Sequence, residues 1–281
     1  MNVMRASGSS YSDRFRELIR SLTGISLPQS KVVMIDQRLR RRVLAFDLPD
    51  TEAYLRQLLD GQGMEEEMRI VIDLITTNTT SFFREADHFD FLVNEALPQR
   101  LALARSNRRP RFKLWSAAAS EGAEAYTAAM MLAEAQRRGT QFDFAVLGTD
   151  ISQRMIERGA EAVYAADQLS TVPPDLVKRY FMSSRHSSVA GKVRVVPELR
   201  RHVQFRHLNL MDETYPVDRD VDLIFLRNIL IYFDAADQAR VVEHLAEHIA
   251  PQGYLVVGHA ESMVVRLAGL KQVRPTIFQK V

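Results

Sequence analysis

The chain has 281 residues, 46% of them hydrophobic, and its 37 basic and 35 acidic side chains leave a formal net charge of +2. This length accommodates one large domain or two smaller ones, each with a buried core, and so small a net charge does not by itself indicate nucleic-acid binding. The sequence has no cysteine, which excludes disulfides, thiolate metal sites and cysteine nucleophiles. No run approaches the roughly 18 apolar residues of a membrane span, and the first residues lack an apolar signal region. We therefore expect a cytoplasmic protein that does not insert into a membrane.

The first part of the chain carries apolar residues at helical spacing. Four sets of such residues follow one another between Ser12 and Ile75. Pro28, Pro49 and a glycine-bearing turn separate them. The pattern predicts a small all-helical domain, which we place at residues 1–86.

A polar run from Thr76 to Glu85 follows the last of these predicted helices. It combines hydroxyls, an amide and a guanidinium with Phe82 and Phe83. Buried hydroxyls need hydrogen-bond partners, so the run suits a binding site better than a core. The alternative is a well-capped loop anchored by two rings, because helix ends collect Ser, Thr and Asn.

After this run, short apolar segments alternate with helical ones. The predicted strands are Phe112–Trp115, Phe142–Leu147, Val221–Leu226, Tyr254–Val257 and Thr276–Gln279, and the predicted helices lie at about Asp87–Ala104, Ala123–Arg138, Ser152–Ala160 and Ala235–His248. Such alternation is typical of a mostly parallel sheet with helices on both faces. The runs Lys192–Val196 and His202–Phe205 break the rhythm and predict a small antiparallel β insertion at about residues 183–205.

In an open parallel sheet, a ligand binds beyond the carboxyl ends of the strands. Small residues from Ser116 to Ala119 follow the first predicted strand and would let a ligand approach the backbone near a helix start. Asp150 follows the second, where nucleotide-binding sheets place a carboxylate that accepts ribose hydroxyls. The alternative for Asp150 is an N-cap of the next helix. The first turn has only Gly122 and lacks the G-x-G-x-x-G pattern, so a nucleoside without phosphates fits better, and S-adenosylmethionine is the obvious candidate.

Five short motifs extend this prediction to a family. They are Asn78-x-Thr80-x-x-x-Arg84-Glu85, Trp115-Ser116-Ala117 with Ser120-x-Gly122-x-Glu124-x-Tyr126, Thr149-Asp150-Ile151, Phe225-x-Arg227-Asn228-x-x-Ile231-Tyr232-Phe233 and Gly258-His259-x-Glu261-Ser262. In order and approximate spacing, the chain resembles the CheR family of chemotaxis receptor methyltransferases over nearly its whole length. The resemblance implies an α/β fold: a Rossmann-like S-adenosylmethionine-dependent methyltransferase sheet at residues 87–281, preceded by the all-helical domain and interrupted by the small β insertion.

The resemblance also implies an activity, the methylation of glutamate side chains on the cytoplasmic helices of a chemoreceptor. Carried over by position, the cofactor contacts fall on Asn78, Thr80, Arg84, Glu124, Asp150, Asn209, Leu210, Asn228 and Ile229. We expect Arg84 and Tyr232 to face the reacting carboxylate. In the family's first turn, two consecutive acidic residues and a proline usually precede the tyrosine, whereas here Ala123 and Ala125 flank Glu124. This departure leaves open a non-catalytic or weakly active signalling relative.

Two regions are candidates for receptor contact. The predicted helix near residues 31–46 gathers Lys31, Arg38, Arg41 and Arg42 on the side opposite its apolar residues. This basic face is either solvated or a dock for glutamate-rich receptor helices. The β insertion resembles a subdomain that in some family members binds a peptide at the receptor C-terminus by strand addition.

Other site classes receive less support from the sequence. His244 and His248 have the i, i+4 spacing of zinc ligands but lie on a predicted amphipathic helix, so we predict no metal site. His259 is expected to order the turn in which it lies. A nucleic-acid methyltransferase would explain the fold and the basic stretches, but the sequence has no Asn/Asp-Pro-Pro-Tyr/Phe motif and no evident aromatic platform for a flipped base. We expect no nucleic-acid partner.

Overall fold

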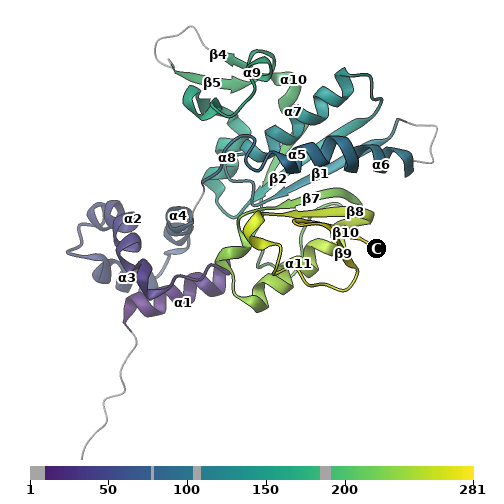
Figure 1. The fold of residues 1–281 in the computed structure, drawn as a ribbon. Helices are drawn as coiled ribbons and strands as arrows, with labels where there is room; N and C mark the ends of the chain where they lie inside the picture. Colours follow the sequence, from purple (N-terminus) through teal and green to yellow (C-terminus); the bar gives the residue numbers. More distant parts are fainter. Residues whose placement is uncertain (1–9, 77–78, 104–108, 184–190) are drawn as a thin grey trace, which may run out of the picture. The chain divides into compact units, whose positions relative to one another are not determined.

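The structure is a computed structural model that describes residues 10–76, 79–103, 109–183 and 191–281 (Figure 1). The chain divides into two compact units, residues 1–77 and residues 78–281, so the first unit ends before the boundary expected at residue 86. Phe82 accounts for the difference. Its side chain is buried in the core of the second unit, and its carbonyl accepts a 2.7 Å hydrogen bond from Thr171 Oγ1.

The first unit is all-helical, as the sequence pattern predicts. Its elements are α1 (Tyr11–Thr23), the 3-10 turn η1 (Gln29–Lys31), α2 (Val32–Ala45), α3 (Thr51–Asp60) and α4 (Glu65–Ile75). Ser10 and Asp50 cap α1 and α3, because their side chains accept backbone N–H groups of the first helical turn. Phe15, Leu39 and Leu55, from three of the helices, are fully buried and contribute to the core of this unit.

Two of the four basic residues expected on the exposed side of α2 are engaged inside the helical unit. Arg38 donates to the carbonyl groups that end α4, where no intrahelical donor remains. Arg42 forms a two-point ion pair with Glu67. Lys31 and Arg41 are exposed. The exposed basic face is therefore smaller than the helical periodicity suggested.

The second unit is built on a seven-stranded sheet in the order β6-β2-β1-β7-β8-β10-β9. Its strands are β1 (Arg111–Ala117), β2 (Asp143–Asp150), β6 (Val203–His207), β7 (Val221–Leu226), β8 (Ile249–Val257), β9 (Leu270–Arg274) and β10 (Ile277–Lys280). The first five in sheet order run parallel, and β10 and β9 are antiparallel additions. Every residue of β7 is buried, as expected for a central strand covered on both faces. The predicted mostly parallel sheet is confirmed.

Helices cover both faces of this sheet. They are α5 (Asp87–Phe91), the π-helical segment η2 (Leu92–Ala96), α6 (Leu97–Leu103), α7 (Ala123–Arg137), α8 (Gln153–Glu161), α9 (Pro174–Tyr180), α10 (Pro197–Arg200) and α11 (Ala235–His248), with 3-10 turns η3 (Ala166–Leu169), η5 (Leu230–Tyr232) and η6 (His259–Glu261). Helix α7 and helix α11 lie on opposite faces (Figure 1). Phe205 of β6 packs against Tyr126 of α7, and Trp115 of β1 packs against His248 of α11. None of the described helices is long and apolar enough to cross a bilayer.

The predicted antiparallel insertion exists, but with different bounds. Its strands are β3 (Val163–Ala165), β4 (Phe181–Ser183) and β5 (Lys192–Val195), in the order β3-β5-β4. The insertion therefore recruits β3 from outside the expected range of 183–205. The assignment of His202–Phe205 to it is wrong, because β6 instead pairs in parallel with β2 in the large sheet. Alternating apolar residues in a short segment predict that the segment forms a strand, but they do not predict which other strand it pairs with.

Candidate active site

The loops that follow the parallel strands converge at one end of the large sheet, and several of their residues adopt left-handed backbone angles. In this conformation a Cβ crowds the neighbouring carbonyl, so non-glycine residues there mark a constrained or functional loop. The left-handed residues of these loops and of the polar run are Phe83, Glu85, Ala118, Ser120, Gly122 and Asn228. Their conformations must be held by surrounding contacts, and a network of buried charges supplies those contacts.

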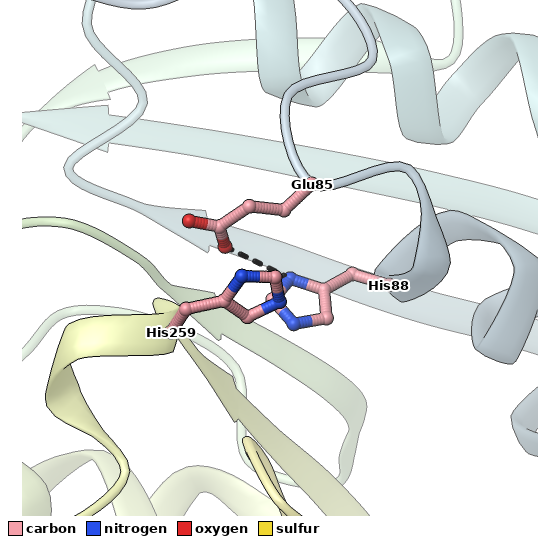
Figure 2. Close-up of side chains that lie close together, drawn as sticks. All are labelled: Glu85, His88 and His259. Carbon is pink, nitrogen blue, oxygen red and sulfur yellow. Dashed lines mark ion pairs between the residues drawn. The ribbon is translucent and has the colours of Figure 1, made fainter.

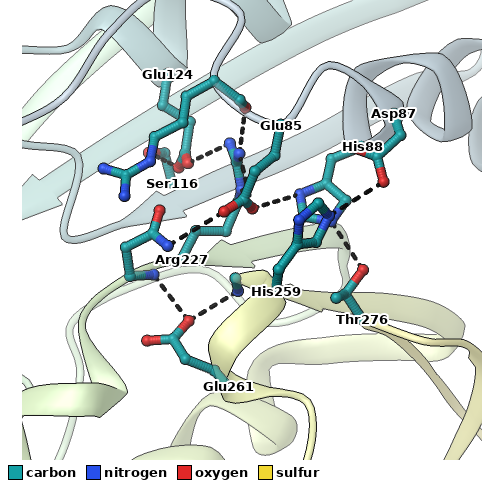
Figure 3. A network of polar contacts seen from close by, with 12 residues as sticks. Glu85, Asp87, His88, Ser116, Glu124, Arg227, His259, Glu261 and Thr276 are labelled. Carbon is teal, nitrogen blue, oxygen red and sulfur yellow. Dashed lines mark hydrogen bonds and ion pairs between the residues drawn. The ribbon is translucent and has the colours of Figure 1, made fainter.

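Arg227 is the centre of this network (Figure 3). It directly follows the buried strand β7, and its side chain is only 2% exposed. Nη1 donates to Glu124 Oε2 at 2.9 Å, Nη2 donates to Glu85 Oε2 at 3.2 Å, and Nη2 also donates to the carbonyl of Arg84. The guanidinium also lies 5.4 Å from the ring centroid of Phe89. One buried cation thus connects the polar run to the first turn, which bears Glu124.

The two carboxylates on Arg227 have opposite pKa shifts. Burial raises the pKa of Glu124, although Arg227 and Ser116, whose hydroxyl donates to Oε1 at 2.6 Å, oppose that effect. Burial would also raise the pKa of Glu85, but Arg227 and the side-chain amide of Asn228 hold it below its usual value. Glu85 is therefore ionised at neutral pH and shares its charge between a guanidinium and an amide.

Glu261 fixes the loop that follows β7 from the other side. Its side chain is fully buried, and Oε2 accepts the backbone N–H groups of Asn228 and Gly258, both at 2.8 Å. A Cβ on Gly258 would lie 2.6 Å from Asn228 Nδ2 and 2.8 Å from Glu261 Oε2, so any larger residue would push the loop apart. The contact holds Asn228 in its left-handed conformation, next to Arg227.

Asp150 orders the ends of two loops at once. It is 6% exposed, Oδ2 accepts the N–H of Ser120 at 2.8 Å, and Oδ1 accepts the N–H of Ser152 at 2.9 Å. The alternative reading of Asp150 as the N-cap of α8 is wrong. Ser152 caps that helix by accepting the N–H of Met155. The carboxylate therefore stands at the strand end in a fixed orientation, bonded to the first turn.

Of the other residues expected at the cofactor site, those that the structure describes lie on the same group of loops. Asn78 lies outside the described residues, whereas Thr80 and Ile229 are half-buried. Asn209 accepts the N–H of Met211 at 3.0 Å, in the loop after β6. Leu210 is buried in that loop, and its carbonyl accepts the hydroxyl of Tyr215 at 2.7 Å.

The two residues expected at the reacting carboxylate are partly accessible. Arg84 is half-buried, and its Nη1 donates to the carbonyl of Thr79 at 3.3 Å within the polar run. Tyr232 is half-buried at the end of η5. Within the described ranges, no hydrogen bond joins the two side chains. Both can therefore turn toward a substrate without breaking a mutual contact.

Sequence reasoning did not select the four side chains that organise these loops. Ser116, Glu85, Arg227 and Glu261 stood inside the quoted motifs, but none was chosen as a site residue. A usable signal existed for Arg227. A charged residue directly after a continuous apolar run, here Leu223–Leu226, must be paired if the strand is central. The partners could not be named from the sequence, because they come from loops more than 100 residues apart.

A histidine cluster borders the network (Figure 2). His88 is fully buried, its Nε2 lies 2.8 Å from Thr276 Oγ1, and its Nδ1 lies 3.4 Å from Glu85 Oε2. Burial lowers the pKa of His88 to about 4, and Arg227 acts in the same direction. Glu85, His88 and His259 bring one ligand atom each within 4.8 Å of one another. Glu85 is already bound to Arg227, and His259 Nε2 lies 3.3 Å from a carboxylate oxygen of Asp87, so the arrangement favours a structural role.

Comparison with known proteins decides the family. Residues 78–277 match the family described as CheR methyltransferase, SAM binding domain, and residues 12–76 match CheR methyltransferase, all-alpha domain. The chain belongs to the CheR methyltransferase family. Chemotaxis protein methyltransferase 2 of Pseudomonas aeruginosa is 35% identical over 265 residues, which are 94% of this CheR chain and 90% of that protein. The chemotaxis protein methyltransferase of Escherichia coli is 36% identical over 250 residues, 89% of this chain and 83% of that protein.

The family assigns S-adenosylmethionine as the cofactor of this CheR protein, and the described residues fit that molecule. Asp150 presents a buried carboxylate at a strand end, and an ionised carboxylate only accepts hydrogen bonds, which suits ribose hydroxyls. The residues from Ala117 to Ser120 are all small, so little side-chain volume stands between a ligand and the backbone beside it. Helix α7 begins there, with its N-terminal dipole toward the loop. Asp150 would hold the ribose, and Glu124 and Asn228 would bound the opposite end of the site.

Proposed function

We propose that this CheR protein transfers the methyl group of S-adenosylmethionine to glutamate side chains on the cytoplasmic helices of a bacterial chemoreceptor, in sensory adaptation. The products would be glutamyl methyl esters and S-adenosylhomocysteine. The names of the relatives, chemotaxis protein methyltransferases, support the receptor as substrate. The observation that carries the proposal is the Arg227 network, which ties the run bearing Arg84 to the turn bearing Glu124 at the cofactor end of the sheet.

The proposed chemistry needs no general base. A glutamate carboxylate has an unperturbed pKa near 4.3 and is ionised at neutral pH. When bound, S-adenosylmethionine supplies a methyl group already activated by a positively charged sulfur. What remains for the protein is to place the attacking oxygen and exclude water, and such alignment is worth several kcal/mol, up to about 7–11 in well-oriented systems.

Arg84 and Tyr232 are the proposed positioning groups. Arg84 would donate to one oxygen of the substrate carboxylate while the other oxygen attacks, and Tyr232 would donate a second hydrogen bond. The backbone of Arg84 is held in place, because its carbonyl oxygen accepts a hydrogen bond from the buried Arg227 side chain. Within the part of the chain that the structure describes, the Arg84 side chain donates one hydrogen bond, to the carbonyl of Thr79 at 3.3 Å. A fixed backbone with an adaptable side chain suits a group that must meet an incoming carboxylate.

The exposed side of α2 is the proposed receptor dock. Arg40 and Arg41 of α2 are exposed, as is Lys31 at the end of η1 directly before it. A basic surface would steer a glutamate-rich helical bundle in a salt-dependent manner. Arg38 and Arg42, which belong to the expected set, act from within the helical unit. We therefore propose that they support the shape of α2 rather than contact the receptor.

The small sheet is the proposed place for a receptor C-terminal peptide. In the order β3-β5-β4, both β3 and β4 are edge strands among the described strands. An edge offers unpaired N–H and C=O groups to an added strand. Adding the free peptide to methylation reactions that contain an intact receptor, with a receptor lacking its own C-terminus as the control, would test this. Inhibition of the intact receptor by the free peptide is the expected result.

The function is tested by incubating the protein with labelled S-adenosylmethionine and a receptor cytoplasmic fragment. We expect base-labile label on glutamates, located by mass spectrometry and absent when those glutamates are replaced by alanine. Arg84→Lys retains the charge but not the planar fork and should lower kcat. Tight cofactor binding without transfer to any receptor fragment would favour a non-catalytic signalling relative. Label on DNA or RNA would contradict the proposed substrate.

A further inference from the structure

A second concave site lies on the large sheet, away from the loops described above. It is a cavity of about 280 Å³ on the sheet face formed by β1, β2 and β6, and we call it the β1–β2–β6 cavity. Lys113 pairs with Ala145 and Trp115 with Leu147 in the β1–β2 register. Leu147 pairs in turn with Gln204 of β6. These residues all line the cavity, and paired residues in a sheet point to the same face.

Helix α11 covers a neighbouring part of the same face of the sheet. Trp115 at the inner end of the cavity packs against His248 of α11, with ring centroids 5.6 Å apart. On the opposite face, Phe205 packs against Tyr126 of α7. The cavity therefore occupies the part of the α11 face that α11 does not reach, beside the segment before β7 that contributes Val217 and Asp218.

The cavity is strongly basic. Arg111, Lys113, Arg201 and Arg206 contribute four cations, and Asp218 contributes one carboxylate. Lys113 Nζ lies 3.2 Å from that carboxylate, whose side chain is 79% exposed. Arg111 and Arg206 have no acidic partner among the described residues. A chain of net charge +2 thus concentrates three net positive charges around one small hollow.

The floor of the cavity is apolar. Ala145 and Leu147 face it from β2 and are half-buried, and the fully buried Trp115 closes its inner end. The cations alone would be enough to bind an inorganic anion, and such an anion would make no use of the apolar floor. An apolar floor inside a cationic rim suits a ligand with a flat or hydrophobic body and several negative charges. The volume is close to the lower limit of roughly 300 Å³ for small-molecule sites, which matches a mononucleotide better than a larger cofactor.

The cavity is separate from the cofactor site. Arg111 and Lys113 lie at the start of β1, and Arg201 precedes β6. Arg206 lies near a carboxyl strand end, but it pairs with Thr149 and so points to the face of the sheet opposite to that of Asp150. The cofactor loops follow the carboxyl ends of the same strands. Nothing in the methyl-transfer chemistry uses these cations.

We propose that the β1–β2–β6 cavity is a second ligand site, which binds a small phosphorylated organic anion of nucleoside-diphosphate size. Arg111 binds the phosphates as a charge-assisted donor, the body of the ligand lies over Ala145 and Leu147, and Arg206, which lies toward the other end of the cavity opposite Thr149, donates to the polar edge of that body. The proposal does not depend on the proposed receptor substrate, because the cavity and the methyl-transfer loops share none of these residues.

Trp115 provides a local probe, since it is the only tryptophan of the chain and lines the cavity. The full-length protein is titrated with GDP without magnesium while tryptophan fluorescence is recorded. S-adenosylhomocysteine is kept saturating throughout, so that the nucleotide cannot report from the cofactor site. We expect a saturable fluorescence change, with 1:1 stoichiometry by calorimetry and affinity that falls as salt rises.

Matched variants locate the binding. Arg111→Ala and Arg206→Ala remove exposed side chains, so the protein should remain folded, and each should weaken GDP binding roughly tenfold or more. Arg109→Ala is the control, because Arg109 pairs with Asp143 and does not line the cavity. S-adenosylhomocysteine affinity should be unchanged in all three. The absence of saturable binding, or equal binding by the wild type and the two cavity variants, would overturn the proposal.

Discussion

Each unit of this protein contains an arginine paired with glutamate, and the two clusters differ in the elements that they hold together. In the helical unit, Arg42 binds Glu67 through two hydrogen bonds, and the hydroxyl of the fully buried Tyr54 donates to the same carboxylate. In the catalytic unit, Arg227 binds Glu85 and Glu124. The first cluster joins three regular helices, whereas the second joins two loops to the first turn of α7.

The difference lies in the backbone around the two clusters. Glu85, and Asn228 directly after Arg227, have left-handed backbone angles. Arg42, Tyr54 and Glu67 all lie within helices. Regular helices satisfy their own backbone groups, so the first cluster adds only a crosslink. Loops with strained backbone have no such internal support, so the second cluster determines where the groups that meet cofactor and substrate lie.

Arg227→Met should have the largest effect. It leaves Glu85 and Glu124 without their shared cation, and breaking a buried ion pair on one side costs about 3–5 kcal/mol. We expect this loss in the free energy of unfolding by urea denaturation, with methylation reduced beyond detection. Arg227→Lys should recover part of the stability but little activity, because ammonium lacks the planar fork. Normal activity in Arg227→Met would refute the central role of the network.

Acidification should destabilise the region around Arg227, which includes His88, at a higher pH than the Arg42 cluster. The pKa of His88 falls to about 4 in the folded protein, below an unfolded value near 6.5. Its contribution to stability is therefore complete above pH 6.5 and is lost as the pH falls toward 4, at up to about 1.4 kcal/mol per pH unit. Burial would raise the pKa of Glu67, but Arg42 and Tyr54 hold it below its usual value, so that cluster should weaken only below about pH 4.5.

Thermal melts of the wild type and His88→Gln between pH 4 and pH 7 measure this difference. The variant should be less stable than the wild type at pH 7 and should have a flatter dependence on pH. Parallel curves for the two proteins would mean that His88 is not the titrating group.

Asp150→Ala should weaken S-adenosylmethionine binding by about 10–100-fold, since hydrogen bonds to a charged group are worth about 1.5–3 kcal/mol. Titration calorimetry with S-adenosylhomocysteine checks this. Asp143→Ala, at the start of the same strand, is the matched control and should bind normally. Equal affinities of the two variants for S-adenosylhomocysteine would show that Asp150 does not contact the cofactor.

Arg42→Met should be milder than Arg227→Met. The side chain is 28% exposed, and we expect a loss of about 1–3 kcal/mol confined to the helical unit. Affinity for S-adenosylhomocysteine should be unchanged, as measured by calorimetry on the same preparation. A large loss of cofactor affinity would show that the two clusters are energetically coupled. It would contradict the inference that the Arg42 cluster stabilises only the helical unit.

Arg41→Glu should have the smallest effect on the protein itself. The side chain is exposed, and surface substitutions usually change stability by less than about 0.5 kcal/mol. Receptor methylation should nevertheless slow through a higher KM at low salt, and the difference should shrink as salt increases. A KM equal to that of the wild type at low salt would place the receptor elsewhere.

Several features of this protein could be predicted from the sequence because they depend on local pattern. The helical domain followed from apolar spacing at 3.6 residues, and β7 and α11 were predicted with the bounds that they have. Asp150 was selected from its place after an apolar strand, and the motifs identified the family. Each of these inferences uses neighbours along the chain, whose spacing the backbone geometry fixes.

Only the tertiary structure decided which distant residues meet. The pairing of Arg227 with Glu85 and Glu124, the placement of β6 in the large sheet and the engagement of Arg38 and Arg42 inside the helical unit all join segments far apart in sequence. A single sequence shows that a buried charge must have a partner. It does not identify the partner, because any of the acidic residues satisfies the chemistry until packing brings two loops together.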